Sequence, residues 1–257
     1  MRKVLPLGAA AIVAAAPAAA GAAQKGVGAF YVGASFQPRI VMDGWGANLR
    51  LDDARVRDPK GFAAMTLWLT TNSDAAPFGP DGATKPYLAV SVTKGWFTLK
   101  GKYHKGLAFV CSQRTLDGTY REGKPQGPVA TLGQTYGIGT QIMRDGTVIA
   151  SVGPDPVCTF PDAATPQNDY GRSLSAFAGA EASSASNTVT GSVTNLNWSS
   201  PYSAGGSRLK HVGWSIGNGK GTGNHARLVK RGPASTPAWT KGRKYQELPV
   251  SFGPLAG

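Results

Sequence analysis

Charged residues, histidine and cysteine are scarce in this chain. Charged side chains make up 16% of the 257 residues, and there are three histidines and two cysteines. Two distant cysteines and three scattered histidines lack the spacing of a zinc site, so we expect no metal. We also expect no cofactor and no nucleotide, because the glycine-rich stretch at residues 217–223 lacks the spacing of a phosphate-binding loop.

Strong helix formers are also sparse, whereas 35 glycines and 18 prolines are present. Apolar residues recur at every second position in short runs, for example at Phe30, Val32 and Ala34 and at Leu88 and Val90. Side chains of a strand point alternately to opposite faces, so each run predicts a strand with one buried face. We predict an all-β fold, an antiparallel β-sandwich of the jelly-roll or concanavalin-like type.

Turn residues separate the alternating runs. The Asp-Gly pair at 145–146 predicts a hairpin, and the prolines at 154 and 156 predict a loop. Residues 188–198 predict one long strand. Residues 173–182 have apolar residues at helical spacing and predict a short helix.

The first residues have the pattern of an export signal. A cationic start at residues 1–3 precedes an alanine-rich apolar run, and small residues follow at Ala20 and Ala22. This arrangement is typical of a secretory signal peptide, which we predict over residues 1–22. No later segment is apolar enough for a transmembrane helix. We therefore predict a secreted, periplasmic or cell-surface protein.

Export gives the two cysteines a role. An oxidising compartment favours a disulfide between Cys111 and Cys158, the only pair in the chain. Closing a loop of this length stabilises a fold by about 4 kcal/mol in the chain-entropy model. We predict that the two residues are bridged.

Positive charge is concentrated toward the C-terminus. The formal net charge is +13, and residues 201–257 hold nine Lys and Arg against a single Glu. We predict a β-sandwich domain over residues 23–200, followed by a basic, glycine-rich β segment that stands apart or completes the same domain. Within that segment, residues 210–216 and 225–229 are expected to pair as a hairpin with the glycine-rich stretch at its tip.

This asymmetry of charge attracts polyanions. Aromatic residues among basic ones suit sugar rings, although solubility and core packing explain the same residues without a ligand. The predicted ligand residues are basic or aromatic and come from two regions: Trp96, Lys100, Lys102, Tyr103, Lys105, Arg208, Lys210, Trp214, Lys220, Arg227, Lys230 and Arg231. We predict that the protein binds an acidic polysaccharide or another extracellular polyanion.

A serine hydrolase is a poor fit. Residues 213–217 (GWSIG) match the G-x-S-x-G pattern of a nucleophile elbow around Ser215. An elbow is followed by a helix, but four of the seven residues at 217–223 are glycines. The acid and then the histidine must also follow, whereas here His225 precedes Glu247.

Two other classes stay open. A polysaccharide lyase or glycoside hydrolase acting on an acidic glycan is one, with its catalytic residues unknown. A lyase would use the residue types of Tyr103, His104 and Lys105, and a glycosidase needs two acids within reach of each other. The acids that are close in sequence are Asp52 with Asp53, Asp117 with Glu122, and Asp155 with Asp162. A structural cell-surface or virion component is the other class.

Overall fold

The computed structural model describes residues 30–36, 44–70, 87–99, 102–114, 120–122, 129–143, 147–160, 175–199, 210–211, 213–214, 225–231 and 247–253. Every regular element in these stretches is a β-strand. None of them contains a helix that could cross a membrane. Secretion stays a prediction.

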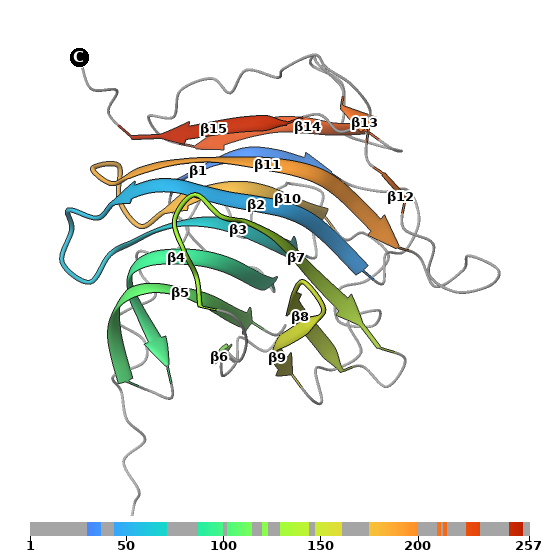
Figure 1. The fold of residues 1–257 in the computed structure, drawn as a ribbon, viewed down its shortest axis with the longest axis horizontal. Helices are drawn as coiled ribbons and strands as arrows, with labels where there is room; N and C mark the ends of the chain where they lie inside the picture. Colours follow the sequence, from blue (N-terminus) through green and yellow to red (C-terminus); the bar gives the residue numbers. More distant parts are fainter. Residues whose placement is uncertain are drawn as a thin grey trace, which may run out of the picture.

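The strands form two sheets that face each other (Figure 1). In the eight-stranded sheet the order is β13-β14-β1-β10-β3-β4-β5-β6, and all pairs are antiparallel except β13 with β14. Its strands are β1 (Phe30–Phe36), β3 (Phe62–Thr70), β4 (Tyr87–Leu99), β5 (Lys102–Arg114), β6 (Tyr120–Glu122), β10 (Ser175–Ala182), β13 (Gly213–Trp214) and β14 (His225–Arg231).

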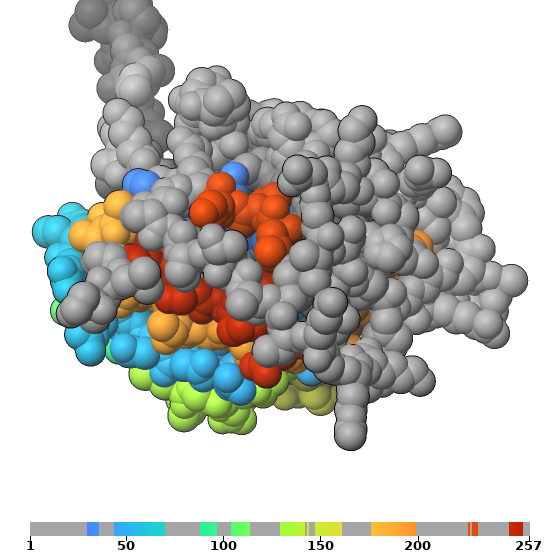
Figure 2. All heavy atoms as spheres, turned by 90° about the horizontal axis from the view of Figure 1, so that it is seen from above, coloured from blue at the N-terminus to red at the C-terminus, as the bar shows by residue number. Residues whose placement is uncertain are grey.

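The seven-stranded sheet has the order β12-β11-β2-β7-β8-β9, with β15 also paired to β11. Figure 2 shows β15, β11, β2 and β7 following one another along one side of the molecule. The strands of this sheet are β2 (Gly44–Arg55), β7 (Thr135–Ile142), β8 (Val148–Val152), β9 (Asp155–Phe160), β11 (Thr188–Ser199), β12 (Lys210–His211) and β15 (Leu248–Phe252).

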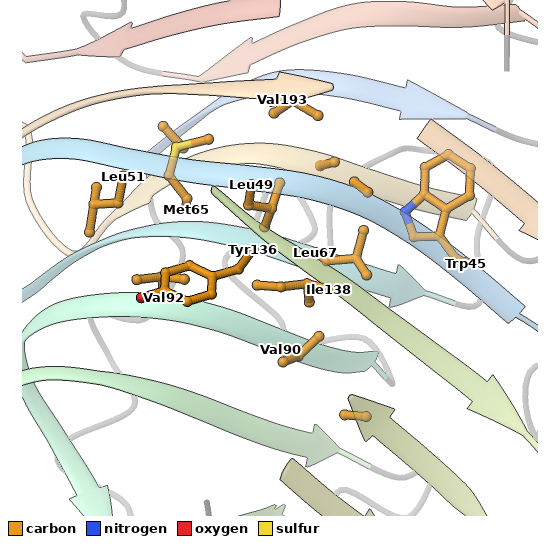
Figure 3. Packing of buried hydrophobic residues seen from close by; sticks show 14 of the residues in the cluster. Trp45, Leu49, Leu51, Met65, Leu67, Val90, Val92, Tyr136, Ile138 and Val193 are labelled. Carbon is orange, nitrogen blue, oxygen red and sulfur yellow. The ribbon is translucent and has the colours of Figure 1, made fainter. Parts of the chain in front are cut away.

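The apolar rows predicted from alternation meet between the two sheets (Figure 3). Leu49 and Ile138 from one sheet and Leu67 and Val90 from the other are all buried there. Burial of such a row provides the main driving force for folding. The predicted all-β sandwich is confirmed; its jelly-roll or concanavalin-like type stays a prediction.

A disulfide joins the two sheets. Cys111 on β5 is bonded to Cys158 on β9, with their Cα atoms 6.3 Å apart. The predicted bridge is confirmed. Because β9 is at the edge of its sheet, the bond holds an edge strand of one sheet to the other sheet.

The helix predicted over residues 173–182 is wrong. Residues 175–182 form β10, which lies between β1 and β3. Its core face carries only alanines, and its outer face carries Phe177, Gly179 and Glu181. Both faces are buried, and a strand of this kind lacks the clean polar alternation that would identify it.

The loop predicted after Val152 is also wrong. Residues 155–160 form β9, and Pro156 lies beside a register shift in the pairing with β8. An edge strand accepts proline at a bulge, because no neighbouring strand needs its missing N–H. The hairpin predicted at 145–146 has both of its strands, β7 and β8, although the turn itself lies outside the described residues. The long strand predicted over residues 188–198 is confirmed as β11.

The hairpin predicted within the basic segment is wrong. Strand β13 pairs with β14 in parallel, whereas a hairpin requires antiparallel strands. The strands of this segment instead pair with earlier ones: β14 with β1, and β12 and β15 with β11. The strands of this segment thus pair mainly with strands far away in the sequence rather than with each other as a hairpin.

Replacing Cys111 and Cys158 by alanine should lower the free energy of unfolding by about 4 kcal/mol, because the open loop gains entropy in the unfolded chain. Urea denaturation of the double variant beside the wild type measures the difference. Mass spectrometry of the wild type, with and without reductant, is the control and should show a gain of two hydrogens on reduction. Equal masses would contradict the bridge.

Candidate functional site

The structure describes the side chains of three of the twelve predicted ligand residues: Trp96, Lys105 and Lys230. For six others only the strand backbone is described: Lys102, Tyr103, Lys210, Trp214, Arg227 and Arg231. Lys100, Arg208 and Lys220 lie outside the described residues, as does Ser215.

Trp96 and Lys105 are brought together by the long β4–β5 pair. They are direct partners in the register, and the Lys105 ammonium lies 6.0 Å from the centre of the Trp96 ring. The Trp96 ring is half-buried and Lys105 is exposed. This distance is at the outer limit of a cation–π contact, so the attraction is weak.

The backbone at Trp96 is fixed by the turn before β3. Its N–H donates a hydrogen bond to the carbonyl of Gly61 at 2.8 Å. Gly95 has a φ of +122°, and a Cβ there would meet the Gly61 carbonyl oxygen at 2.5 Å. A glycine is therefore required where the two chain segments approach.

Other basic residues are near this pair along the chain, although His104, the register partner of Phe97, lies on the opposite face of the β4–β5 pair. Lys94 is half-buried two residues before Trp96, while Lys60 and His104 are exposed. We call Lys60, Lys94, Trp96, His104 and Lys105 the Trp96 end. It holds three lysines and no carboxylate of its own, and therefore carries a positive field.

The structure does not bring Lys230 to the Trp96 end. Lys230 is exposed on β14, and three strands (β1, β10 and β3) lie between β14 and β4. Four strand spacings amount to about 19 Å. The two basic regions predicted from the sequence are thus separate in the part of the fold that is described.

A second candidate site lies on the outer face of the eight-stranded sheet, at Glu181 on β10. Its residue is 7% exposed, and one of its oxygens, Oε2, accepts a hydrogen bond from the Trp68 indole Nε1–H at 3.2 Å. Burial raises the pKa of Glu181 to about 7, although the hydrogen bond from Trp68 acts in the opposite direction. A carboxyl of this kind holds its proton up to neutral pH.

Aromatic rings pack against the Trp68 indole that contacts this carboxyl. Phe177 stacks on Trp68 with ring centroids 4.1 Å apart, and Tyr31 meets both rings edge-on, at 5.6 Å from Trp68 and 5.8 Å from Phe177. The Phe177 ring lies over the paired glycines Gly33 and Gly179, where a Cβ would come within 2.8 Å and 2.7 Å of its Cζ. The bare glycine backbone makes room for the rings.

Of the acid pairs named from the sequence, only Asp52 and Asp53 are both described, and each is engaged with an arginine. Asp52 pairs with Arg50 at 2.7 Å and Asp53 with Arg55 at 3.6 Å, and both acids are exposed. Asp155 is exposed on β9, whereas Asp117 and Asp162 lie outside the described residues and only the backbone of Glu122 is described. No group of three potential metal ligands occurs in the described stretches.

Sequence reasoning missed Glu181. The signal for it is a single carboxylate in an otherwise apolar run, residues 175–182 (SAFAGAEA). That signal is visible only once the run is read as a strand, because the alternation then places Glu181 on the face opposite the alanines.

No protein-family model matches this sequence, and no curated protein matches it. Scytalido-glutamic peptidase with a transition-state analogue inhibitor is a similar solved structure, with 11% identity, a TM-score of 0.43, and coverage of 86% of this chain and 98% of that one. SCP-B of the eqolisin family of peptidases, in complex with a tripeptide, is 11% identical with a TM-score of 0.42, and the match covers 86% of this chain and 98% of that one. Sheep galectin-11 with glycerol is 12% identical with a TM-score of 0.31, and the match covers 56% of this chain and 86% of that one. Similarities this weak say nothing of what this chain binds or cleaves.

The raised pKa of Glu181 makes the stability of the fold depend on pH. Because the folded carboxyl keeps its proton up to about pH 7 and the unfolded one loses it near 4.5, its contribution is full below pH 4.5 and is lost as pH rises to 7. The loss amounts to roughly 3 kcal/mol. In Glu181→Gln this part of the pH dependence should vanish in urea denaturation between pH 4 and 8.

Glu247→Gln is the matched control, because Glu247 is a half-exposed glutamate that pairs with Arg50 at 3.4 Å. Its profile should keep the fall in stability between pH 4.5 and 7. A Glu181→Gln profile that parallels the wild type would contradict the assignment.

Proposed function

We propose that this chain is an exported protein that binds an acidic polysaccharide, or another extracellular polyanion, at the Trp96 end. The observation that carries the proposal is the placement of the Lys105 ammonium beside the half-buried Trp96 ring. A uronate sugar presents a C–H face and a carboxylate. The indole suits the first of these groups and the ammonium suits the second.

The field around this pair supports the same proposal. Lys94 lies two residues before Trp96, and Lys60 precedes Gly61, whose carbonyl accepts the Trp96 N–H. The nearest acid along the chain, Asp58, accepts a hydrogen bond from the Ser183 hydroxyl at 2.9 Å, and its carboxylate lies against Gly61. Attraction of a polyanion to such a surface is long-ranged and weakens with salt.

Replacing both Lys94 and Lys105 by glutamine should raise the Kd for an alginate oligosaccharide about tenfold at low salt, equivalent to 1.4 kcal/mol. The ratio to wild type should shrink as salt rises, since screening removes the attraction. Trp96→Ala should weaken binding at all salt concentrations. Isothermal titration at two ionic strengths measures both effects.

The basic C-terminal segment is tested in the same assay by changing Lys220, Arg227, Lys230 and Arg231 to glutamine. Those residues were predicted to carry the polyanion affinity, and their loss should matter only if a second contact exists. If the tail variant loses binding while the Lys94 and Lys105 variant keeps the wild-type Kd, the Trp96 end is not the site.

A hydrolase is the second candidate, and Glu181 is the observation that favours it. A buried carboxyl with a pKa of about 7 can donate a proton to a leaving group at neutral pH, as a general acid does. The described residues place no second carboxylate beside it, so the paired acids of a glycosidase do not support this candidate. A hydrolase at this site would therefore act with Glu181 as the one acid and with a water molecule as the nucleophile.

Glu181→Gln should abolish hydrolysis, because an amide has no acidic proton to transfer. Wild-type activity should fall as pH rises past 7, where the carboxyl loses its proton. The assay is product release from an acidic glycan panel and from a denatured protein between pH 3 and 8. Glu247→Gln serves as the control and should keep wild-type activity. Equal turnover by wild type and Glu181→Gln would contradict this candidate.

A further inference from the structure

The two oxygens of Glu181 are not equivalent. Oε2 accepts the Trp68 Nε1–H at 3.2 Å. An indole N–H can donate but never accept, so the oxygen that it touches must offer a lone pair. In a protonated carboxyl the oxygen with this role is the carbonyl oxygen. The proton therefore belongs on Oε1.

The surrounding packing holds the indole in the direction that this hydrogen bond needs. In the register Trp68 is opposite Phe177, and Glu181 is four residues further along β10. The indole thus stacks on the Phe177 ring, which itself lies over Gly179, and reaches along β10 to Glu181. Stacking on Phe177 and the edge contact of Tyr31 fix the ring plane, since both contacts depend on its orientation.

We propose that Trp68 is a positioning residue that binds Oε2 of Glu181 and so confines the transferable proton to Oε1. This inference rests on the hydrolytic function proposed above and adds to it the oxygen that donates. In the step, the Oε1 proton moves to the leaving oxygen or nitrogen as its bond to carbon breaks. Water supplies hydroxide to the carbon, and its remaining proton returns to the carboxylate.

The other groups that face Glu181 come from its two neighbouring strands. Tyr31 on β1 is its register partner, and Thr66 lies on β3. The phenol and the hydroxyl can both donate and accept, so neither restricts the proton to one oxygen as an indole does.

The chain allows a direct measurement, because it contains three glutamates and six tryptophans. In protein labelled with ¹³C at the glutamate carboxyl carbon, the resonance missing from Glu181→Gln belongs to Glu181. We expect it to titrate near pH 7 in the wild type. In Trp68→Phe, which keeps a ring and loses the N–H, its midpoint should move to higher pH, because the lost hydrogen bond favoured the charged form.

Trp45→Phe is the matched control. Trp45 is 2% exposed in the core between the sheets, on β2, and lies in the sheet that does not carry Glu181. Its replacement removes a buried indole N–H from the protein at a different place. The Glu181 midpoint should therefore stay at the wild-type value in Trp45→Phe.

A second readout uses the wild type and does not depend on the folding of a Trp68 variant. With ¹⁵N-labelled tryptophan, one indole N–H should titrate with the same midpoint as the Glu181 carboxyl. This titration should be absent in Glu181→Gln. If no indole N–H bonded to the Glu181 carboxyl in solution, every indole resonance would be independent of the charge on Glu181.

The kinetic consequence separates this inference from the hydrolytic function itself. Trp68→Phe should lower kcat on the order of a hundredfold with little change in KM, since the proton is no longer held in place. The pH at which activity falls on the alkaline side should rise together with the Glu181 midpoint measured by NMR. An unmoved Glu181 midpoint in Trp68→Phe, or no titrating indole in the wild type, overturns the inference. If both spectroscopic results hold and the wild type hydrolyses no substrate, the hydrolytic function fails and the positioning of the proton stands.

Discussion

Burial of β10 on both faces is the constraint on which the rest of this structure depends. Its core face can carry only small side chains, because Leu67 and Met65 of β3 occupy the space beside it. Its outer face is covered as well, with Phe177 fully buried and Glu181 7% exposed. Burial disfavours the charged form of the carboxyl, and this raises its pKa.

The same strand explains why glycines and aromatic rings occur together there. Gly179 faces Gly33 on β1, and any Cβ at these positions would collide with the neighbouring backbone. Two adjacent bare positions leave a depression on the sheet, and the rings of Phe177, Trp68 and Tyr31 fill it. Close packing of this kind fixes ring orientations, and a fixed indole gives a hydrogen bond with a fixed direction.

The two candidate sites work through different physics, and Trp96 and Glu181 lie on the two strands that flank β3. The Trp96 end is exposed, so its charges act over long distances and are weakened by salt. Glu181 is buried, so it acts only on what touches it. Gly61, which fixes Trp96, immediately precedes β3, and Trp68 lies on β3 about 23 Å further along at 3.3 Å per residue.

The sequence by itself determined the all-β class, the strands with one wet face, and the bridge between Cys111 and Cys158, because alternation and cysteine count are local properties of the chain. It misassigned residues 175–182, since a strand buried on both faces has no polar alternation to report. Only the tertiary structure decided that Glu181 is buried, that Trp68 donates to it, and that Lys105 lies beside Trp96. Each of these depends on which strands become neighbours, and that is set by long-range packing rather than by adjacent residues.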